Sequence, residues 1–377
     1  MYIFQKHLEN LRRFVSPGRV VIVYGARRVG KTTLINKFRE LEKDSNTLFL
    51  NGDDIAARQY LESQSINKLR DFMGNASLLI IDEAQYVKNI GLNLKLIVDH
   101  LKDLRIIVTG SSSFELANDV GEPLTGRKLV LKLFPLSQME LAETEKMHET
   151  DANLESRLIY GSYPEVVITS DNRFREEYLR EMISSYLFKD ILAFEGIRYS
   201  DKIIRLLQLL AFQIGREVSM NELGKQLGMS KNTVEKYVDL LEKVFVIFKR
   251  RGFSRNLRKE ISKTYRYYFL DNGIRNALIN NFNPLSLRND TGELWENYIV
   301  TERLKKLEYT RAGVNSYFWR TYDKKEIDIV EEGGGKLSGF EIKWNDSRAK
   351  APKDWYMNYP DAGFEVVNRS NYIKFIT

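Results

Sequence analysis

The chain has 377 residues, of which 43% are hydrophobic and 12% aromatic, so it is long enough for two or three domains with packed cores. It has no cysteine and three histidines, which excludes disulfides, thiolate zinc sites and cysteine nucleophiles and argues against a histidine-rich metal site. Magnesium or manganese bound by oxygen atoms stays open. The net charge of +7 suits an acidic partner such as nucleic acid, although many basic soluble proteins have no such partner.

The first 14 residues, MYIFQKHLENLRRF, carry charges among their apolar residues and contain no continuous apolar core. We therefore expect no signal peptide, but a helix whose apolar face docks on the first domain. That face is formed by Ile3, Phe4, His7, Leu8, Leu11 and Phe14. No stretch approaches the roughly 20 apolar residues that span a bilayer, so we expect a cytoplasmic protein without a membrane contact.

A phosphate-binding motif follows in RVVIVYGARRVGKTTLINKF. A β-branched run precedes Gly25, and Gly30 comes after four intervening residues. Lys31 and Thr32 then open an apolar helical pattern, as the motif G-x-x-x-x-G-K-[ST] requires. The glycines let backbone N–H groups wrap a phosphate at the positive end of the helix. Lys31 can then reach the β- and γ-phosphates, and the Thr32 hydroxyl can ligate Mg²⁺.

This loop is predicted to hold the phosphates of a nucleotide. The predicted contacts are Gly25, Arg28, Val29, Gly30, Lys31, Thr32 and Thr33. For the charged groups of Arg27 and Arg28 we favour solvated surface positions over a contact to a base or a partner. The alternative for the whole motif is a glycine turn that binds nothing, and a second motif argues against it.

That second motif is ASLLIIDEAQ, an apolar strand that ends in Asp82 and Glu83. In an open parallel sheet, ligands gather at the carboxyl ends of the strands, so both carboxylates are expected beside the phosphate loop. Asp82 would hold Mg²⁺ directly or through water, and Glu83 would polarise the attacking water. A strand ending in two acids is common by chance, but not in this order and spacing after a phosphate loop.

Two further segments offer polar groups to the same site. The strand LRIIVTGSSS ends in Thr109, Ser111 and Ser112, of which one could sense the γ-phosphate, although hydroxyls are also ordinary in turns. In PLTGRKLVLKLFPLS, Arg127 precedes another strand. It could stabilise transition-state charge from within the chain or from a neighbouring subunit, or it could be a surface arginine.

Taken together, these motifs resemble the AAA-type ATPases of bacteria and archaea that carry a winged-helix segment and a C-terminal domain of unknown function. The residues that carry the resemblance are GARRVGKTTL, LLIIDEAQ, VTGSSSFEL, LTGRKLVLKLFPLS, YGSYPEVV, FLDNGIRNAL and LWENYIV. The resemblance implies binding and hydrolysis of ATP in a role that is poorly defined across the family. It also places Ser111 in the polar sensor position and Arg127 in the Gly-Arg element.

The middle third is predicted to be helical. RFREEYLREMISSYLFKDIL resembles the bridging helices that link such an ATPase core to the next module. Residues 201–253 then show the helix, short helix, turn and helix order of a helix-turn-helix, with Ser230 as the N-cap of the last helix. The predicted core residues are Leu223, Leu227, Val234, Val238 and Leu241. The residues predicted to face outward are Lys231, Asn232, Glu235 and Lys236.

Basic residues concentrate after these helices, in the segment expected to form a wing. Eight of them, against the single acid Glu260, are Lys249, Arg250, Arg251, Arg255, Arg258, Lys259, Lys263 and Arg266. Such a wing could bind phosphates with an affinity that depends on salt and carries no sequence information. The predicted nucleic-acid contacts are Lys231, Lys236, Arg250, Arg251 and Arg255. The alternative is a packing or protein-binding module with a solvated loop.

The last third contains the hairpin KKEIDIVEEGGGKLSGFEIKW, preceded by a helix that Thr291 is expected to cap. Strand alternation predicts that Ile327 and Ile329 share one face and that Glu326 and Asp328 share the other. Beyond the glycines, the same rule separates one apolar and one polar set. The apolar set is Phe340, Ile342 and Trp344, and the polar set is Glu341 and Lys343.

If the apolar sets share one core, the polar side chains meet on the opposite face and could form a metal-dependent phosphodiester-cleaving site. Asp328 and Glu341 would bind Mg²⁺ or Mn²⁺, and Lys343 would stabilise negative charge or orient the attacking water. Glu296 on the preceding helix could add a carboxylate. This pattern resembles the restriction-endonuclease-like fold, except that Ile327 stands where many members carry proline. The alternatives are a hairpin with a solvated polar face and a nuclease fold without activity.

We therefore predict an α/β chain with a P-loop NTPase (AAA-type) parallel-sheet core, a winged-helix middle and a small α/β nuclease-like C-terminal domain. The predicted boundaries are 1–140 for the ATPase core, 141–200 for the helical bridge, 201–285 for the winged helix and 286–377 for the nuclease-like domain. The leading function is an Mg²⁺-dependent ATPase that acts on or signals through nucleic acid. The alternative is a nucleotide-dependent switch that assembles with protein partners, and an oligomer is compatible with both.

Overall fold

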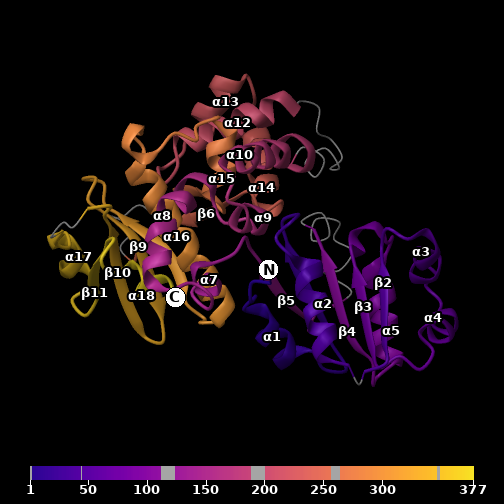
Figure 1. The fold of residues 1–377 in the computed structure, drawn as a ribbon. Coiled ribbons are helices and arrows are strands. Elements are labelled where there is room, and N and C mark those ends of the chain that lie inside the picture. Colours follow the sequence, from indigo (N-terminus) through magenta and orange to yellow (C-terminus); the bar gives the residue numbers. More distant parts are fainter. Residues whose placement is uncertain (1, 44, 112–123, 188–199, 256–263, 346–348) are drawn as a thin grey trace.

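The computed structural model describes residues 2–43, 45–111, 124–187, 200–255, 264–345 and 349–377. These residues form a mixed α/β molecule whose largest sheet has five strands, beside a four-stranded and a two-stranded sheet. The five-stranded and four-stranded sheets lie at opposite sides of the molecule, with helices of the middle third between and above them (Figure 1). The predicted α/β class with a parallel-sheet core is confirmed.

The first third is built on the five-stranded sheet, whose strand order is β2-β3-β4-β1-β5 and whose pairs are all parallel. Its strands are β1 (Val20–Gly25), β2 (Thr47–Asn51), β3 (Leu78–Asp82), β4 (Arg105–Gly110) and β5 (Lys128–Leu133). The helices are α1 (His7–Phe14), α2 (Lys31–Leu41), α3 (Ile55–Leu61), α4 (Ile66–Met73), η1 (Ala84–Tyr86) and α5 (Ile90–His100).

The continuous apolar run of β1 reflects burial on both faces of this sheet. Val21 and Val23 pack in one hydrophobic cluster, while Val20 and Ile22 pack in another on the opposite face. All six residues of β1 are buried. The strand that leads into the phosphate loop is therefore fixed from both sides.

The predicted N-terminal helix is present as α1, and Leu8 and Leu11 are buried in the cluster that contains Val21 and Val23. This confirms its docking on the first sheet. The helix also contacts the C-terminal third, because the Asn10 side-chain amide donates a hydrogen bond to the Tyr309 carbonyl at 3.0 Å.

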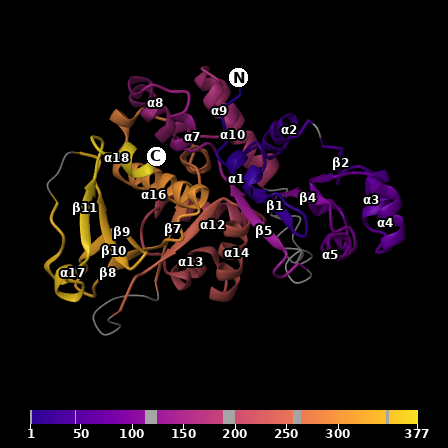
Figure 2. The same ribbon diagram turned by 90° about the horizontal axis from the view of Figure 1, so that it is seen from below.

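The middle third is mainly helical. Its helices are α7 (Gln138–Leu141), α8 (Met147–Tyr160), α9 (Pro164–Ile168), α10 (Asn172–Glu181), the π-helix η2 (Met182–Leu187), α12 (Ser200–Phe212), α13 (Met220–Leu227), α14 (Lys231–Lys243), α15 (Asn272–Leu278) and the 3₁₀ turn η3 (Leu285–Leu287). Between α14 and α15 lie the antiparallel strands β6 (Ile247–Arg251) and β7 (Tyr265–Phe269). Figure 2 shows α12, α13 and α14 between the two larger sheets.

Several local predictions for this third are confirmed. The Ser230 hydroxyl caps α14 by accepting a hydrogen bond from the Thr233 backbone N–H at 3.1 Å. The five predicted core residues are all buried. Helices α12, α13 and α14 followed by β6 and β7 have the element order expected of a winged helix, and that name stays a prediction.

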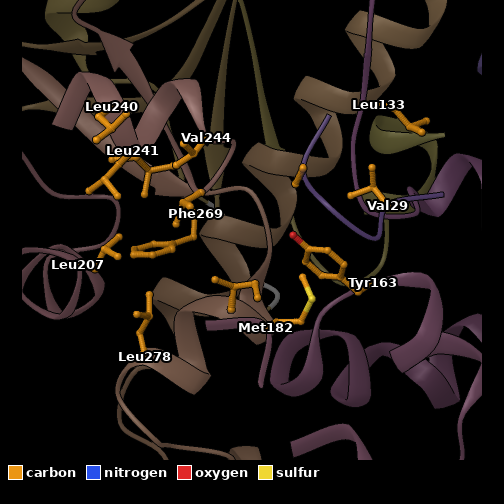
Figure 3. Close-up of a cluster of buried hydrophobic side chains, with 14 of the residues drawn as sticks. Val29, Leu133, Tyr163, Met182, Leu207, Leu240, Leu241, Val244, Phe269 and Leu278 are labelled. Atoms are coloured by element: carbon orange, nitrogen blue, oxygen red, sulfur yellow. The ribbon is translucent and has the colours of Figure 1, made fainter. Parts of the chain in front are cut away.

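One hydrophobic core connects the phosphate loop to the middle third. Figure 3 shows Val29 and Leu133 on one side of this core, with Tyr163 and Met182 between them and Leu207. These five side chains are at most 5% exposed. The phosphate loop is therefore packed directly against residues that the sequence assigns to another segment.

The C-terminal third contains the four-stranded sheet in the order β11-β10-β9-β8. Its elements are α16 (Thr291–Thr310), β8 (Asn315–Arg320), β9 (Glu326–Gly333), β10 (Lys336–Ile342), α17 (Lys353–Asn358), β11 (Gly363–Val367) and α18 (Tyr372–Ile376). The predicted cap of α16 is wrong by one residue, because Asp290 occupies the N-cap position and Thr291 is the first helical residue. The Asp290 carboxylate pairs with Arg275 and Arg288.

The predicted alternation along β9 is also partly wrong. Tyr317 pairs with Val330 and Trp319 pairs with Ile327, so β9 has one more residue than β8 over this stretch. Such a bulge interrupts the alternation of side chains and can re-aim one of them. Ile327 and Ile329 consequently pack in different hydrophobic clusters. Phe340, Ile342 and Trp344 all contact the Ile329 cluster, as predicted.

None of the described helices is both long enough and apolar enough to cross a membrane.

Candidate functional site

The predicted phosphate loop lies between the end of β1 and the start of α2. Gly30 is the N-cap of α2 and has a φ of 94°, a left-handed conformation that favours glycine. A Cβ on Gly25 would lie 2.3 Å from the Leu133 carbonyl oxygen, so a side chain has no room there. Both motif glycines are thus required by the backbone path.

Lys31 is the first residue of α2 and is 5% exposed. Its Nζ donates hydrogen bonds to the carbonyl oxygens of Gly25 at 3.0 Å and Ala26 at 2.9 Å. The ammonium group is therefore held across the loop, next to the backbone that is predicted to surround the phosphates.

Thr32 and Asp82 meet at the carboxyl edge of the sheet. The Thr32 hydroxyl donates to Asp82 Oδ2 at 2.8 Å, and the Thr109 hydroxyl donates to Asp82 Oδ1. A hydroxyl and a carboxylate oxygen side by side are ligands that suit Mg²⁺ in a phosphate-binding site. The structure therefore brings together the two residues predicted to hold the metal, and this donor set fits Mg²⁺.

Glu83 follows Asp82 in a left-handed conformation with a φ of 53°. Its carboxylate accepts a hydrogen bond from the Gln85 side-chain amide, and its backbone N–H donates to the Thr109 hydroxyl at 3.2 Å. The Gln85 side-chain oxygen in turn accepts from the Ser111 backbone N–H at 3.2 Å. Glu83 and Ser111 are thus linked through Gln85, which the sequence reasoning did not single out although it stands in the quoted IIDEAQ stretch.

The loop borders an open cleft of about 430 Å³. Five of the predicted contacts line it, namely Arg28, Gly30, Lys31, Thr32 and Thr33. Glu83 lines it too, together with Pro164, Glu165 and Tyr178 from the middle third. Those three were not predicted; Pro164 and Glu165 stand in the quoted YGSYPEVV stretch, and Tyr178 stands in the predicted bridging helices. Val29 is 1% exposed and points into the core, so only its backbone is available to a ligand.

The structure contradicts a role for Arg127 at the phosphates of its own chain. Lys128 pairs with Val20 and Leu133 pairs with Gly25, so Arg127 lies at the amino edge of the parallel sheet, opposite the loop. The five steps along β5 from Lys128 to Leu133 separate the two edges by about 17 Å. Arg127 instead pairs with Asp99 near the end of α5. A role in a neighbouring subunit stays a prediction. Ser112 lies outside the described residues.

The C-terminal pocket, of about 570 Å³, contains all four residues predicted for the second site. Glu296, Asp328, Glu341 and Lys343 line it together. Asp328 Oδ2 accepts a hydrogen bond from the Ile342 backbone N–H at 2.9 Å, and Lys343 Nζ lies 2.7 Å from Glu341 Oε1. Asp328 therefore lies on the same side as Glu341 and Lys343, as predicted, despite the bulge in β9.

These carboxyl groups are crowded. Burial and, next, the charge of Asp328 raise the pKa of Glu296 to about 8 and that of Glu341 to about 7. Burial also raises the pKa of Asp328. Among the residues that the structure describes, however, no group of three or more His, Cys, Asp or Glu is arranged to hold a metal ion. The predicted residues are gathered, but the metal cage is not formed in this conformation.

An arginine that the sequence assigned to the basic wing lies among these carboxylates. Arg266 on β7 is 4% exposed, and its Nη1 lies 3.5 Å from Asp328 Oδ1 and 3.9 Å from Glu296 Oε1. Its Nη2 pairs with Glu326. No local signal distinguished this arginine from its basic neighbours, because its partners are 30 to 62 residues further along the chain.

The predicted basic surface is also revised. Arg250 is 4% exposed and cannot contact nucleic acid in this conformation. Lys231, Lys236, Arg251 and Arg255 are exposed. Arg255 pairs with Glu332, and the Arg251 guanidinium lies 5.1 Å from the centre of the Tyr317 ring. Arg258, Lys259 and Lys263 lie outside the described residues.

Comparison with protein families divides the chain into three matched segments. Residues 17–142 match a family described as an AAA domain. This match supports an AAA-type ATPase. Residues 151–285 and 291–373 match two families described as domains of unknown function, DUF8612 and DUF4143.

Similar proteins span most of this chain. An uncharacterized protein of Haemophilus influenzae is 25% identical over 353 residues, which covers 86% of this chain and 82% of that protein. An uncharacterized protein of Mycobacterium tuberculosis is 26% identical over 338 residues, covering 88% of this chain and 72% of that protein. The solved structure of AMPPCP-bound DnaA from Aquifex aeolicus covers 64% of this chain and 86% of that chain, with 18% identity and a TM-score of 0.31.

Proposed function

We propose that the protein binds ATP with Mg²⁺ at the phosphate loop and hydrolyses it. The observation that carries this proposal is the meeting of the Thr32 hydroxyl and the Asp82 carboxylate, 2.8 Å apart, beside the Lys31 ammonium. Thr32 and Asp82 would hold Mg²⁺, which neutralises charge on the phosphate oxygens when bound. Lys31 would exchange its two carbonyl partners for phosphate oxygens.

Glu83 would orient and deprotonate the attacking water, since it lines the cleft at the end of β3. Gln85 would position its carboxylate through their hydrogen bond. Ser111, tied to Gln85 at the end of β4, would couple the occupancy of the γ-phosphate site to this group.

The replacement Glu83→Gln is expected to keep ATP binding and to slow hydrolysis by about 10²- to 10⁴-fold, the usual contribution of a general base. Turnover of ATP and equilibrium binding of a fluorescent ATP analogue would be measured on the same samples. Glu40→Gln is the matched control, because Glu40 is exposed on α2 and does not line the cleft, and it is expected to keep turnover. Unchanged hydrolysis in Glu83→Gln would remove Glu83 from the mechanism.

We further propose that this ATPase acts on or signals through nucleic acid, with the α12 to β7 segment as a winged helix. The support is the exposed basic set Lys231, Lys236, Arg251 and Arg255 on its last helix and wing. The competing proposal is a nucleotide-dependent switch that assembles with protein partners. The two differ in whether binding to nucleic acid depends steeply on salt.

Neutralising Arg251 and Arg255 together, as Arg251→Gln and Arg255→Gln, is expected to weaken DNA binding and to lower the salt slope by about 2, one per lost phosphate contact. Fluorescence anisotropy over a series of salt concentrations gives this slope. Lys68→Gln with Lys95→Gln is the control pair, since both lysines are exposed on the first third. Weak affinity that is insensitive to salt in the unmodified protein would favour the protein-interaction switch.

A second candidate function concerns the C-terminal pocket. Its convergence of Glu296, Asp328, Glu341 and Lys343 favours cleavage of phosphodiesters with Mg²⁺ or Mn²⁺. Asp328 and Glu341 would hold the ion, and Lys343 would stabilise negative charge on the phosphate. An inactive nuclease-like pocket that only binds is the alternative.

A further inference from the structure

Arg266 lies where a cation bound by the C-terminal pocket would lie. Its guanidinium contacts Asp328, Glu296 and Glu326, and these come from the strand β9 and the helix α16 of the C-terminal third. Glu341 pairs locally with Lys343, and two further pairs at the pocket, Arg216 with Glu293 and Arg320 with Glu217, also link the two thirds. Arg266 is thus a buried cation of the middle third that lies among three carboxylates of the C-terminal third.

The structure holds this arginine in place from several sides. Its backbone forms a bridge with Glu217, and its guanidinium lies 4.6 Å from the centre of the Phe318 ring. The adjoining Gly215 approaches Glu296 so closely that a Cβ there would lie 2.9 Å from the Glu296 carboxylate. Within the part of the chain that the structure describes, no acceptor lies within hydrogen-bond distance of the buried Arg266 Nε. The guanidinium is held through its two Nη atoms by the carboxylates.

A divalent ion and this guanidinium exclude each other. Mg²⁺ needs carboxylate oxygens at about 2.0–2.1 Å, and two positive centres at that range repel strongly where water is scarce. Arg266 Nη1 lies within 4 Å of both Asp328 Oδ1 and Glu296 Oε1, so an ion bound between these carboxylates would lie against the guanidinium. Removal of one partner of a buried ion pair leaves uncompensated charge, and a metal ion can compensate it.

We propose that Arg266 is the resident occupant of a divalent-cation site formed by Asp328, Glu296 and Glu341, and that Mg²⁺ or Mn²⁺ enters only when Arg266 leaves. This rests on the metal-dependent role proposed for the pocket. It adds that the middle third, through β7, controls access of the ion.

The first test is Mn²⁺ binding, measured by the loss of the free-ion electron paramagnetic resonance signal, together with thermal unfolding. Arg266→Met is expected to unfold at a lower temperature than the unmodified protein and to recover several degrees on adding Mn²⁺. Its Mn²⁺ affinity is expected to rise by at least about tenfold. Arg250→Met is the matched control, because Arg250 is equally buried and lies directly opposite Arg266 in the ladder between β6 and β7. It is expected to lose stability without gaining affinity for the ion.

Two further variants keep the proposal open to refutation if Arg266→Met does not fold. Glu326→Gln removes a half-exposed carboxylate that anchors Arg266 and leaves Asp328 in place. It is expected to bind Mn²⁺ more tightly than the unmodified protein, whereas a simple cluster of acids would bind more weakly after losing one. Adding Asp328→Asn to Arg266→Met or to Glu326→Gln is expected to remove the increase in Mn²⁺ affinity.

Equal Mn²⁺ affinity in the unmodified protein and in both Arg266→Met and Glu326→Gln would overturn the proposal. The nucleotide site is intact in every variant, so any ion held by Thr32 and Asp82 is common to all of them. Ion binding without cleavage would support the occupant role of Arg266 and count against phosphodiester cleavage. Cleavage with unchanged ion affinity would support phosphodiester cleavage and count against the occupant role of Arg266.

Discussion

Replacing Lys31 with alanine is expected to lower the affinity for ATP by at least about 100-fold, which corresponds to about 2.8 kcal/mol. The variant loses a buried ammonium that lies within hydrogen-bond distance of two carbonyls of the phosphate loop. Hydrogen bonds to charged groups contribute about 1.5–3 kcal/mol each, so losing contacts to two phosphates accounts for the expected change. Isothermal titration with ATP and Mg²⁺ measures it, and hydrolysis is expected to fall to background.

Lys37→Ala is the matched control for this experiment. Lys37 lies on the same helix, α2, but is partly exposed and pairs with Glu40 on the surface. It is expected to leave affinity and turnover unchanged, since exposed ion pairs contribute little to stability. Circular dichroism of both variants would show whether the helix persists. Normal ATP binding in a folded Lys31→Ala protein would place the nucleotide elsewhere.

The nucleotide site was predictable because its parts are local. Gly25 to Thr32 are contiguous, and the backbone path of the loop follows from glycine conformations and the start of a helix. Asp82 is distant in sequence, but it ends an apolar strand, and parallel strands present their carboxyl ends at one edge. A general rule of sheet geometry therefore replaced the missing tertiary information.

The same rule did not predict the position of Arg127. Its position before a strand was recognised, but the side of the sheet on which it lies depends on the direction and register of β5 beside β1. A parallel strand places its preceding residue at the amino edge, away from the phosphates. The resemblance of this segment to the family did not indicate whether Arg127 contacts the nucleotide of its own chain or that of a neighbouring subunit.

The C-terminal pocket was predicted in composition but not in conformation. Period-two alternation placed Asp328 correctly with Glu341, while the bulge in β9 separated Ile327 from Ile329. Arg266 could not be assigned from sequence, because a run of basic residues suggests a solvated surface until packing is known. The directly paired Arg250 and Arg266 are both buried, and only tertiary structure reveals the carboxylates around one of them.

The last prediction concerns cleavage at this pocket. Single- and double-stranded DNA and RNA would be incubated with Mg²⁺ or Mn²⁺, with and without ATP, using the unmodified protein, Asp328→Ala and Lys343→Ala. Cleavage by the unmodified protein is expected, and each replacement is expected to reduce it by at least about 100-fold, as loss of a transition-state charge partner does. Arg266→Met is expected to cleave at lower Mn²⁺ concentrations than the unmodified protein, because Arg266 no longer keeps the ion out of the pocket.

Two control variants test whether a loss of cleavage comes from the pocket residues or from a general change in charge or stability. Asp354→Ala and Lys336→Ala change one acid and one base in the same third, outside the pocket, and are expected to keep cleavage. ATP turnover should be unaffected in all of these variants, because none of the altered residues lines the nucleotide cleft. No cleavage with any ion, in a protein that hydrolyses ATP, would leave the pocket as a binding surface. The carboxylates and Arg266 would then act as a charged joint between the middle and C-terminal thirds, and the nucleotide-dependent switch would become the better description.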